Sequence, residues 1–102
     1  MRRIIHRKMY DTDTATCLGR YDNGYGRGDF NYIEESLYRK KSGELFLHGI
    51  GGAMTDYSKR CGQNSWKGGE EIIPLSEAGA KKWAEKRISA DEYETIFGKV
   101  EE

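Results

Sequence analysis

Short alternations of hydrophobic and polar residues run through the first three quarters of the chain, and a period of two residues is typical of β-strands. The sequence predicts five strand segments, over residues 2–10, 15–21, 30–41, 44–48 and 70–75. Ser42-Gly43 has the residues of a tight turn, so the third and fourth segments are predicted to form a hairpin. A helix over 32–38 is the alternative, because apolar residues there also recur at helical spacing.

Charge and proline mark the edges of the predicted sheet. Segment 2–10 carries charged residues on both faces, which suits an edge strand, and the polar turn at 11–14 would join it to 15–21 as a hairpin. Pro74 is the only proline. Since it has no N–H, the last strand lies at a sheet edge or leaves the sheet there.

Glycine is concentrated in two segments that lack strand patterns. Residues 22–29 are too poor in apolar side chains to pack as an element and are predicted to form a loop. Residues 49–69 hold six of the thirteen glycines. Because a structureless loop of about twenty residues is uncommon in a compact domain, we expect a short helical turn near 55–60.

Helical signals are found in the final third of the chain. Ser76 is a suitable N-cap, and an apolar stripe follows it at helical spacing, formed by Ala80, Trp83, Ala84 and Ile88. Ser89 and Glu92 have the spacing of a capping box that starts a second helix, and Gly98 would end it. We expect both helices to dock on the sheet, with the Trp83 side chain buried.

The order of the elements indicates the fold class. Strands come first and helices last, which predicts an α+β fold rather than a parallel α/β fold. We expect an N-terminal antiparallel β-sheet of about four to five strands with two short C-terminal α-helices packed on it. At 102 residues the chain suits a single domain over 1–102, with the sheet and its glycine-rich loops in 1–75 and the helices in 76–98.

Composition narrows the function classes. The chain has 17 basic and 17 acidic side chains, so its formal net charge is zero, whereas nucleic-acid-binding domains are usually basic. No apolar run approaches the ~20 residues of a membrane span, so we expect neither a transmembrane nor a secretory segment. Cys17 and Cys61 are the only cysteines, and they are predicted to be reduced and half-buried in sheet positions of a cytoplasmic protein.

Candidate catalytic and metal-binding patterns are incomplete. His6, His48 and the two cysteines lack the spacing of a structural zinc site, so we expect no metal ion and no other cofactor. The glycine loop at 24–28 has no helix N-terminus after it to hold a phosphate. Glu34-Glu35 and Glu70-Glu71 are adjacent strand residues that point to opposite faces, and they are predicted to be solvated. We predict that the protein is not an enzyme; a hydrolase or nuclease that uses His48 is a disfavoured alternative.

The residue types favour a binding function over catalysis, because exposed aromatic and charged residues are typical of interfaces. Tyrosines are frequent in the first 60 residues, basic residues cluster at 2–8 and 39–41, and acidic residues dominate from residue 88 onward. Segregated charges of this kind steer partners with matching patches. We predict ten partner-binding residues: Tyr25, Arg27, Tyr38, Arg39, Lys40, Lys41, Trp66, Asp91, Glu92 and Glu94.

Several segments spread over nearly the whole chain form a recognisable pattern: Met9-Tyr10-Asp11-Thr12, Asp29-Phe30-Asn31, residues 39–49, Gly51-Gly52-Ala53-Met54-Thr55, Ile72-Ile73-Pro74-Leu75, Trp83-Ala84-Glu85 and residues 91–98. In these segments the chain resembles a family of short proteins found on conjugative elements and phages of gut Firmicutes. Some members resemble type II-A anti-CRISPR proteins, which inhibit the Cas9 nuclease. The family has no catalytic motif to transfer to this chain.

The resemblance implies an anti-CRISPR-like inhibitor in the cytoplasm of a bacterial host. Such a protein would bind Cas9 or its guide complex stoichiometrically and block guide loading, target binding or cleavage. An acidic surface over 91–102 could occupy the positively charged channel of Cas9, and contact through the tyrosine-rich loop is equally open. The alternative is a small nucleic-acid-binding module, in which Arg2, Arg3, Arg7, Lys8 and the 39–41 turn contact phosphates while Tyr25 and Tyr38 stack on bases.

Overall fold

The computed structural model describes residues 1–102 and has an α+β fold with the strands first and two helices last, as predicted. Its main sheet is antiparallel, with the strand order β3-β4-β5-β8. These strands are β3 (Thr16–Asp22), β4 (Ile33–Arg39), β5 (Leu45–Gly51) and β8 (Gly69–Leu75). Two hairpins flank the sheet, β1 (Arg2–Ile5) with β2 (Lys8–Asp11) and β6 (Lys59–Gly62) with β7 (Ser65–Lys67), and the helices are α1 (Glu77–Arg87) and α2 (Ala90–Phe97).

The main sheet has a hydrophobic cluster on each face, because neighbouring residues of a strand point to opposite sides. Leu45 and Leu47 of β5 pack with Leu37 and with Ala80 of α1. Phe46 lies between those leucines in sequence and packs with Tyr10 of β2 and with Ile72 on the other face. The sheet is therefore covered by α1 on one side and by the β1–β2 hairpin on the other.

The β4–β5 hairpin confirms the strongest strand prediction. Its register pairs Arg39 with Leu45, and Gly43 adopts a left-handed φ of 96° that favours glycine. The Lys40 N–H donates to the Glu44 carbonyl at 2.8 Å, so the turn is longer than two residues. The helix considered for 32–38 is not formed, because the apolar residues of β4 pack in the sheet.

The N-terminal strand prediction is wrong. Residues 2–10 do not form one strand, because His6 and Arg7 adopt left-handed φ angles of 49° and 68° and reverse the chain. β1 therefore pairs with β2, and β3 pairs with β4 alone. Segment 2–10 has no continuous apolar face, and folding it in two brings Ile5 and Tyr10 together against the sheet.

The helical turn predicted near 55–60 is also wrong. Residues 53–57 form bends and turns, and the chain then enters the β6–β7 hairpin. Asn64 lies in that hairpin turn with a left-handed φ of 62°, a conformation that asparagine tolerates better than most residues. The polar hairpin accounts for much of the glycine-rich segment without a helix.

The sheet edge and the helix ends follow the sequence closely. β8, which contains Pro74, is an edge strand. Ser76 caps α1 by accepting from the Gly79 N–H, the Ser89–Glu92 capping box is formed, and Gly98 ends α2 with φ 93°. Neither helix has the length and apolar character that a bilayer crossing requires.

Two burial predictions need correction. Trp83 is only half-buried, although it packs against the cluster beneath α1. Cys17 and Cys61 are both unpaired, as expected, but exposed rather than half-buried. The reason for Cys61 is its place on β6, since every residue of that strand is exposed.

Candidate functional site

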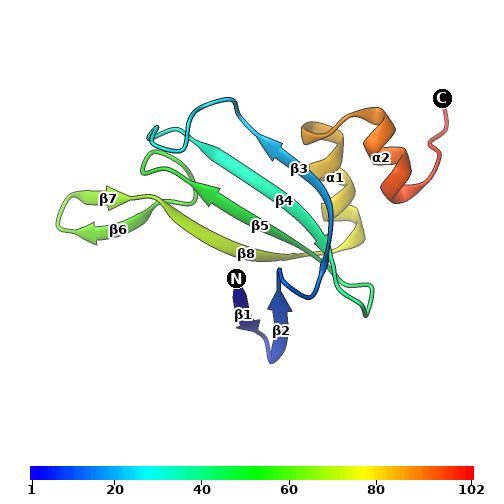
Figure 1. Cartoon of the computed structure of the whole chain (residues 1–102), viewed down its shortest axis with the longest axis horizontal. Coiled ribbons are helices and arrows are strands. Elements are labelled where there is room, and N and C mark those ends of the chain that lie inside the picture. The colour runs from blue at the N-terminus through cyan, green and yellow to red at the C-terminus, as the bar shows by residue number, and fades with distance from the viewer.

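The β6–β7 hairpin projects from the left-hand end of the molecule in Figure 1. Every residue from 59 to 68 is exposed, and Trp66 keeps 57% of its surface accessible. The hairpin carries three cations, Lys59, Arg60 and Lys67, and residues 57–69 include no carboxylate. An exposed tryptophan among several cations is typical of a contact surface rather than of a structural element.

The register of the hairpin sorts these side chains onto two faces. Arg60 is directly opposite Trp66, and Lys59 is directly opposite Lys67. Neighbouring strand residues point to opposite faces, so Arg60 and Trp66 share one face and the two lysines share the other. Lys59 forms an ion pair with Glu71 of β8, and its hydrogen bond holds the pKa of Glu71 below the usual value. Lys67 and Arg60 have no carboxylate partner.

An open groove of about 660 Å³ lies between this hairpin and the loop that follows β3. Trp66 lines it from the hairpin, and Arg27 and Phe30 line it from the loop. Phe30 is 66% exposed. Glycines form part of the lining, and a Cβ at Gly52 would collide with the backbone carbonyls of the loop. The structure thus brings together two predicted site residues, Arg27 and Trp66, that are 39 positions apart.

Arg27 is held at the groove by the carboxylate of Glu34. Glu34 accepts hydrogen bonds from Arg27 at 3.2 Å, from Arg20 at 2.9 Å and from the hydroxyl of Tyr32. The hydrogen bond from Tyr32, followed by the hydrogen bond from Arg20 and the charges of both arginines, lowers the pKa of Glu34. Glu34 was predicted to be a solvated strand residue, and it is instead the half-buried centre of an ion-pair cluster.

Glu35, also predicted to be solvated, is buried on the opposite face of the sheet. Its carboxylate accepts from the Tyr57 hydroxyl at 2.5 Å and from the Trp83 indole N–H at 2.9 Å, and Arg87 lies 3.6 Å away. Burial, followed by the hydrogen bond to Glu35, raises the pKa of Tyr57. This cluster ties the 53–57 turns and α1 to the sheet. The spacing of Gly49 and Gly51, over which the Tyr57 ring lies, was its one sequence signal.

His48 and Glu70 form a pair on the face that carries Phe46. His48 Nε2 lies 2.7 Å from Glu70 Oε2, which is hydrogen-bonding distance. Glu70 was predicted to be solvated, and it instead contacts the histidine of the disfavoured hydrolase alternative. Glu71 is likewise engaged, with Lys59 and with Arg3.

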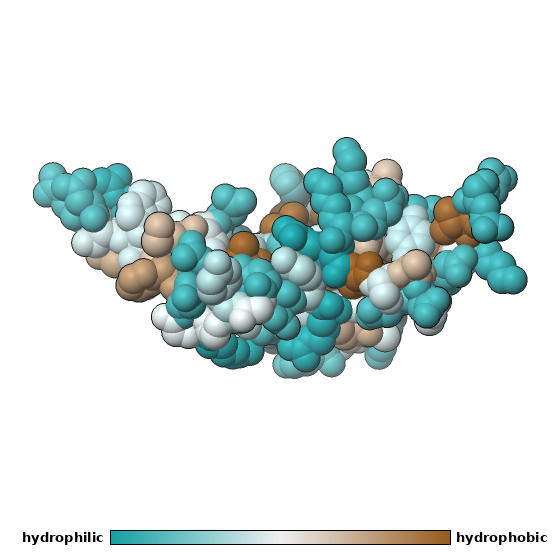
Figure 2. All heavy atoms as spheres, turned by 90° about the horizontal axis from the view of Figure 1, so that it is seen from above, coloured by the Kyte–Doolittle hydropathy of each residue, from teal (hydrophilic) through white to brown (hydrophobic).

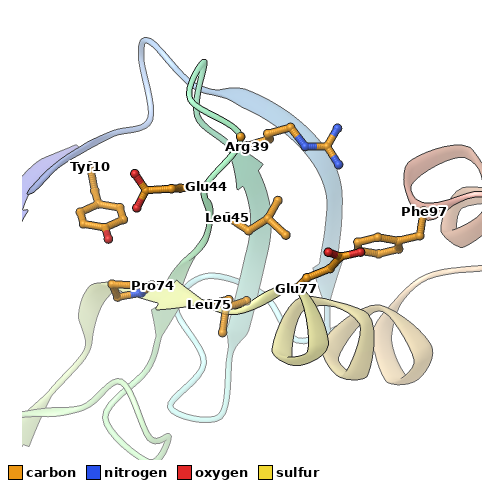
Figure 3. A pocket seen from close by; sticks show the side chains of 9 residues that line it. Tyr10, Arg39, Glu44, Leu45, Pro74, Leu75, Glu77 and Phe97 are labelled. Carbon is orange, nitrogen blue, oxygen red and sulfur yellow. The ribbon is translucent and has the colours of Figure 1, made fainter.

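The predicted residues of the β4–β5 turn line or flank a second hollow, shown in Figure 3. Arg39 points toward the side on which Phe97 lies, and Tyr10 and Glu44 lie on the other side. Lys40 stacks over the Tyr10 ring at 3.7 Å. Tyr38 stacks on Phe46 with ring centroids 5.2 Å apart, so its ring contributes to packing. Lys41 is exposed on the turn.

The N-terminal basic cluster is largely neutralised within the chain. Arg2 pairs with Asp11, Arg3 with Glu71 and Lys8 with Glu44, the last at 3.1 Å. Because their charge is shared with carboxylates, these residues are weaker phosphate ligands than the sequence cluster indicates.

The acidic residues predicted for partner binding lie at the end of the molecule opposite the β6–β7 hairpin (Figure 1). The exposed carboxylates of this end are those of Asp91, Glu92, Glu94, Glu101 and Glu102. None belongs to an ion pair of the structure, and the Glu92 side chain is used in the capping box. Tyr25, 51% exposed, lies in the loop at the hairpin end.

Figure 2 shows one long side of the molecule, on which hydrophilic side chains cover most of the surface and hydrophobic ones form small separate groups. The ten predicted residues lie at the hairpin end, around the β4–β5 turn and on α2, so they do not make one continuous surface. Phe30, Arg60 and Lys67 were missed, and the run of cations around Trp66 without any acidic residue could have indicated the last two.

Comparison with protein-family models, with curated proteins and with solved structures finds no match to this chain.

Proposed function

We propose that this protein is a binding protein that inhibits a Cas9-type nuclease stoichiometrically, by holding Cas9 or its guide complex in an inactive state. The family resemblance supplies the partner. The observation that carries the proposal is the separation of charge along a molecule 49 Å long, with the cationic β6–β7 hairpin at one end and the exposed carboxylates of residues 91–102 at the other.

A guide-loaded nuclease offers complements to both ends. Its guide lies in a positively charged protein channel, and the nucleic acid in that channel is a polyanion. The acidic end suits the channel wall, and the hairpin suits the phosphate backbone. Matching charges mainly raise the association rate and exclude wrong orientations, which is what a competitive blocker needs.

The proposal is tested by titrating the purified protein into a cleavage reaction with a type II-A Cas9, its guide and a target duplex. We expect inhibition that is complete near equimolar protein and a stable complex that co-migrates with Cas9 on gel filtration. Adding the protein before and after the guide, and before and after the target, identifies the step that is blocked. Unchanged cleavage at large molar excess, with no co-migration in any order of addition, would contradict the proposal.

Charge reversal tests the acidic end separately. Glu94→Lys should lower the association rate with the nuclease several-fold, because steering depends on the local field. Asp13→Lys reverses an exposed carboxylate of the turn between β2 and β3 and serves as the matched control. Equal effects of the two changes would mean that net charge alone, and not its location, matters.

A further inference from the structure

We propose that the Arg60–Trp66 face of the β6–β7 hairpin, together with the groove beside it, binds single-stranded nucleic acid. One base stacks on Trp66, Arg60 contacts a phosphate from the same face of the hairpin, and Lys67, which lines the groove, contacts a second phosphate. The inference names the ligand of the cationic end. It rests on the proposed function only for the source of the strand, which would be the guide or an unwound target.

The β6–β7 hairpin has features that lower its own stability. An isolated two-stranded hairpin is marginally stable in water, and like charges directly opposite one another destabilise it further. Lys59 and Lys67 are directly opposite one another, although the ion pair of Lys59 with Glu71 offsets part of their repulsion. Trp66 belongs to neither hydrophobic cluster of the core. The stability of the fold therefore does not explain why Trp66 and the cations occupy this hairpin. A ligand that is anionic and has planar rings would explain both.

The geometry of the Arg60–Trp66 pair suits a nucleotide. Directly opposite residues of an antiparallel pair have Cβ atoms roughly 4.5–5.5 Å apart, so the Arg60 and Trp66 side chains leave the same face of the hairpin as neighbours, and Arg60 Nε donates to the Gly62 carbonyl at 3.3 Å. A base can stack on the indole while the guanidinium reaches its phosphate, because every base has a π-face and arginine pairs bidentately with phosphate oxygens. Phe30 lines the same groove and offers a second ring to a neighbouring base.

The carboxylates near the groove are already engaged. Asp29 accepts from the Asn31 N–H at 2.7 Å, and Glu70 pairs with His48. Glu34 is shared by Arg20 and Arg27, and Glu71 by Lys59 and Arg3. The cations without a carboxylate partner on the hairpin are Arg60 and Lys67, so the unpaired positive charge of this surface lies on the hairpin, while Asp29 keeps a negative charge on the loop side of the groove.

A single strand fits better than a duplex or a polypeptide. In a duplex the base faces are hidden by stacking, so Trp66 would have nothing to stack on. An acidic peptide would satisfy the two cations, but it would leave the two flat rings of the groove without planar partners. Sequence-tolerant stacking is the mode that proteins use for single strands.

The test is a binding titration of the full-length chain with fluorescently labelled 12-nucleotide single strands of DNA and of RNA, at about 50 and 200 mM salt. Two phosphate contacts predict a salt slope of roughly −1.4. Trp66→Ala should weaken binding by about five- to hundredfold, whereas Trp66→Phe should retain most of it. Arg60→Gln should weaken binding and reduce the slope, and Lys82→Gln, which removes an exposed cation of α1, is the matched control.

The variants also keep the inference separable from the proposed function. Oligonucleotide binding that depends on Trp66, without inhibition of Cas9, would leave the inference standing and remove the proposed partner. No binding at low salt, or binding that neither Trp66→Ala nor Arg60→Gln changes, would overturn the inference. So would tighter binding to a duplex of the same sequence, or Trp66-dependent binding to Cas9 that holds no guide.

Discussion

At the scale of single residues, the ring of Tyr57 lies across two glycines of β5 and brings its hydroxyl to the buried carboxylate of Glu35. A buried carboxylate is tolerated only when donors satisfy it, and here Tyr57 of the 53–57 turns and two side chains of α1, Trp83 and Arg87, do so. The contact with Glu35 therefore depends on the small size of Gly49 as much as on the polar groups themselves.

Removing the Tyr57 hydroxyl should destabilise the protein. Tyr57→Phe leaves a buried acceptor short of one donor, which costs about 1–3 kcal/mol of unfolding free energy. Urea denaturation followed by circular dichroism measures this loss. Tyr25→Phe removes the hydroxyl of an exposed tyrosine and should change the midpoint little. Equal midpoints for the two variants would show that the Glu35 contact contributes nothing.

Adding a methyl group at Gly49 should also destabilise the protein. Gly49→Ala places a Cβ within the Tyr57 ring, and forced overpacking of this kind costs about 1–3 kcal/mol. Gly26→Ala is the matched control, since a Cβ there meets no atom within 4 Å. Thermal melting of both variants gives the comparison, and a Gly49→Ala protein as stable as the parent would refute the close approach of Tyr57.

At the scale of elements, α2 depends on its first turn more than on burial. None of its residues is fully buried, and it is only eight residues long. Isolated helices of this length are marginal, so the capping box and the packing of Tyr93 and Phe97, whose rings lie 5.0 Å apart, hold it together. The acidic end of the molecule is therefore presented by a helix that its capping box and the packing of Phe97 against the cluster beneath α1 maintain.

Loss of the Ser89 side chain should loosen this helix. Ser89→Ala removes an N-cap and half of the capping box, which costs about 1 kcal/mol. We expect faster amide hydrogen exchange in residues 90–97 with little change in the main sheet. Ser89→Asp keeps an N-cap acceptor and should restore slow exchange; uniform acceleration across the sheet as well would contradict a local role.

At the scale of the whole molecule, carboxylates paired with cations make the free energy of unfolding depend on pH. Hydrogen bonds and cations lower the pKa of Glu34, with Tyr32 first, and of Glu71, with Lys59 first. A carboxyl whose pKa is lower in the folded state stabilises the protein above its unfolded pKa, and this contribution is lost as the pH falls through the folded value.

The protein should therefore lose stability as the pH falls below about 4.5, the ordinary value of these carboxyl groups. Urea midpoints at pH 7, 5 and 3 measure the change. Glu34→Gln should flatten the pH dependence, whereas Glu85→Gln, which removes an exposed carboxylate that has no ion pair, should leave it unchanged. A midpoint that is constant down to pH 3 would contradict the proposed linkage.

The two ends of the molecule differ in how far the sequence predicts them. The acidic end could be predicted from the sequence, because its residues lie close together in the last twelve positions and are solvated. The groove at the other end could not, because Arg27 and Trp66 meet only through the order of β4, β5 and β8 and through the glycines that let the loops approach. The nuclease titration tests the partner of the acidic end, and the oligonucleotide titration tests the ligand of the hairpin end.

By itself the sequence determined those elements whose signals lie within a few residues of one another. The caps at Ser76 and Ser89, the Gly98 stop, the turn around Gly43 and the order of strands before helices are of this kind, because local hydrogen bonds and backbone preferences decide them. Only the tertiary structure decided which strands pair at the N-terminus, that Glu35 is buried, and that a groove exists. Those outcomes depend on contacts across long sequence distances, such as the 48 positions between Glu35 and Trp83, and local patterns carry no information about such contacts.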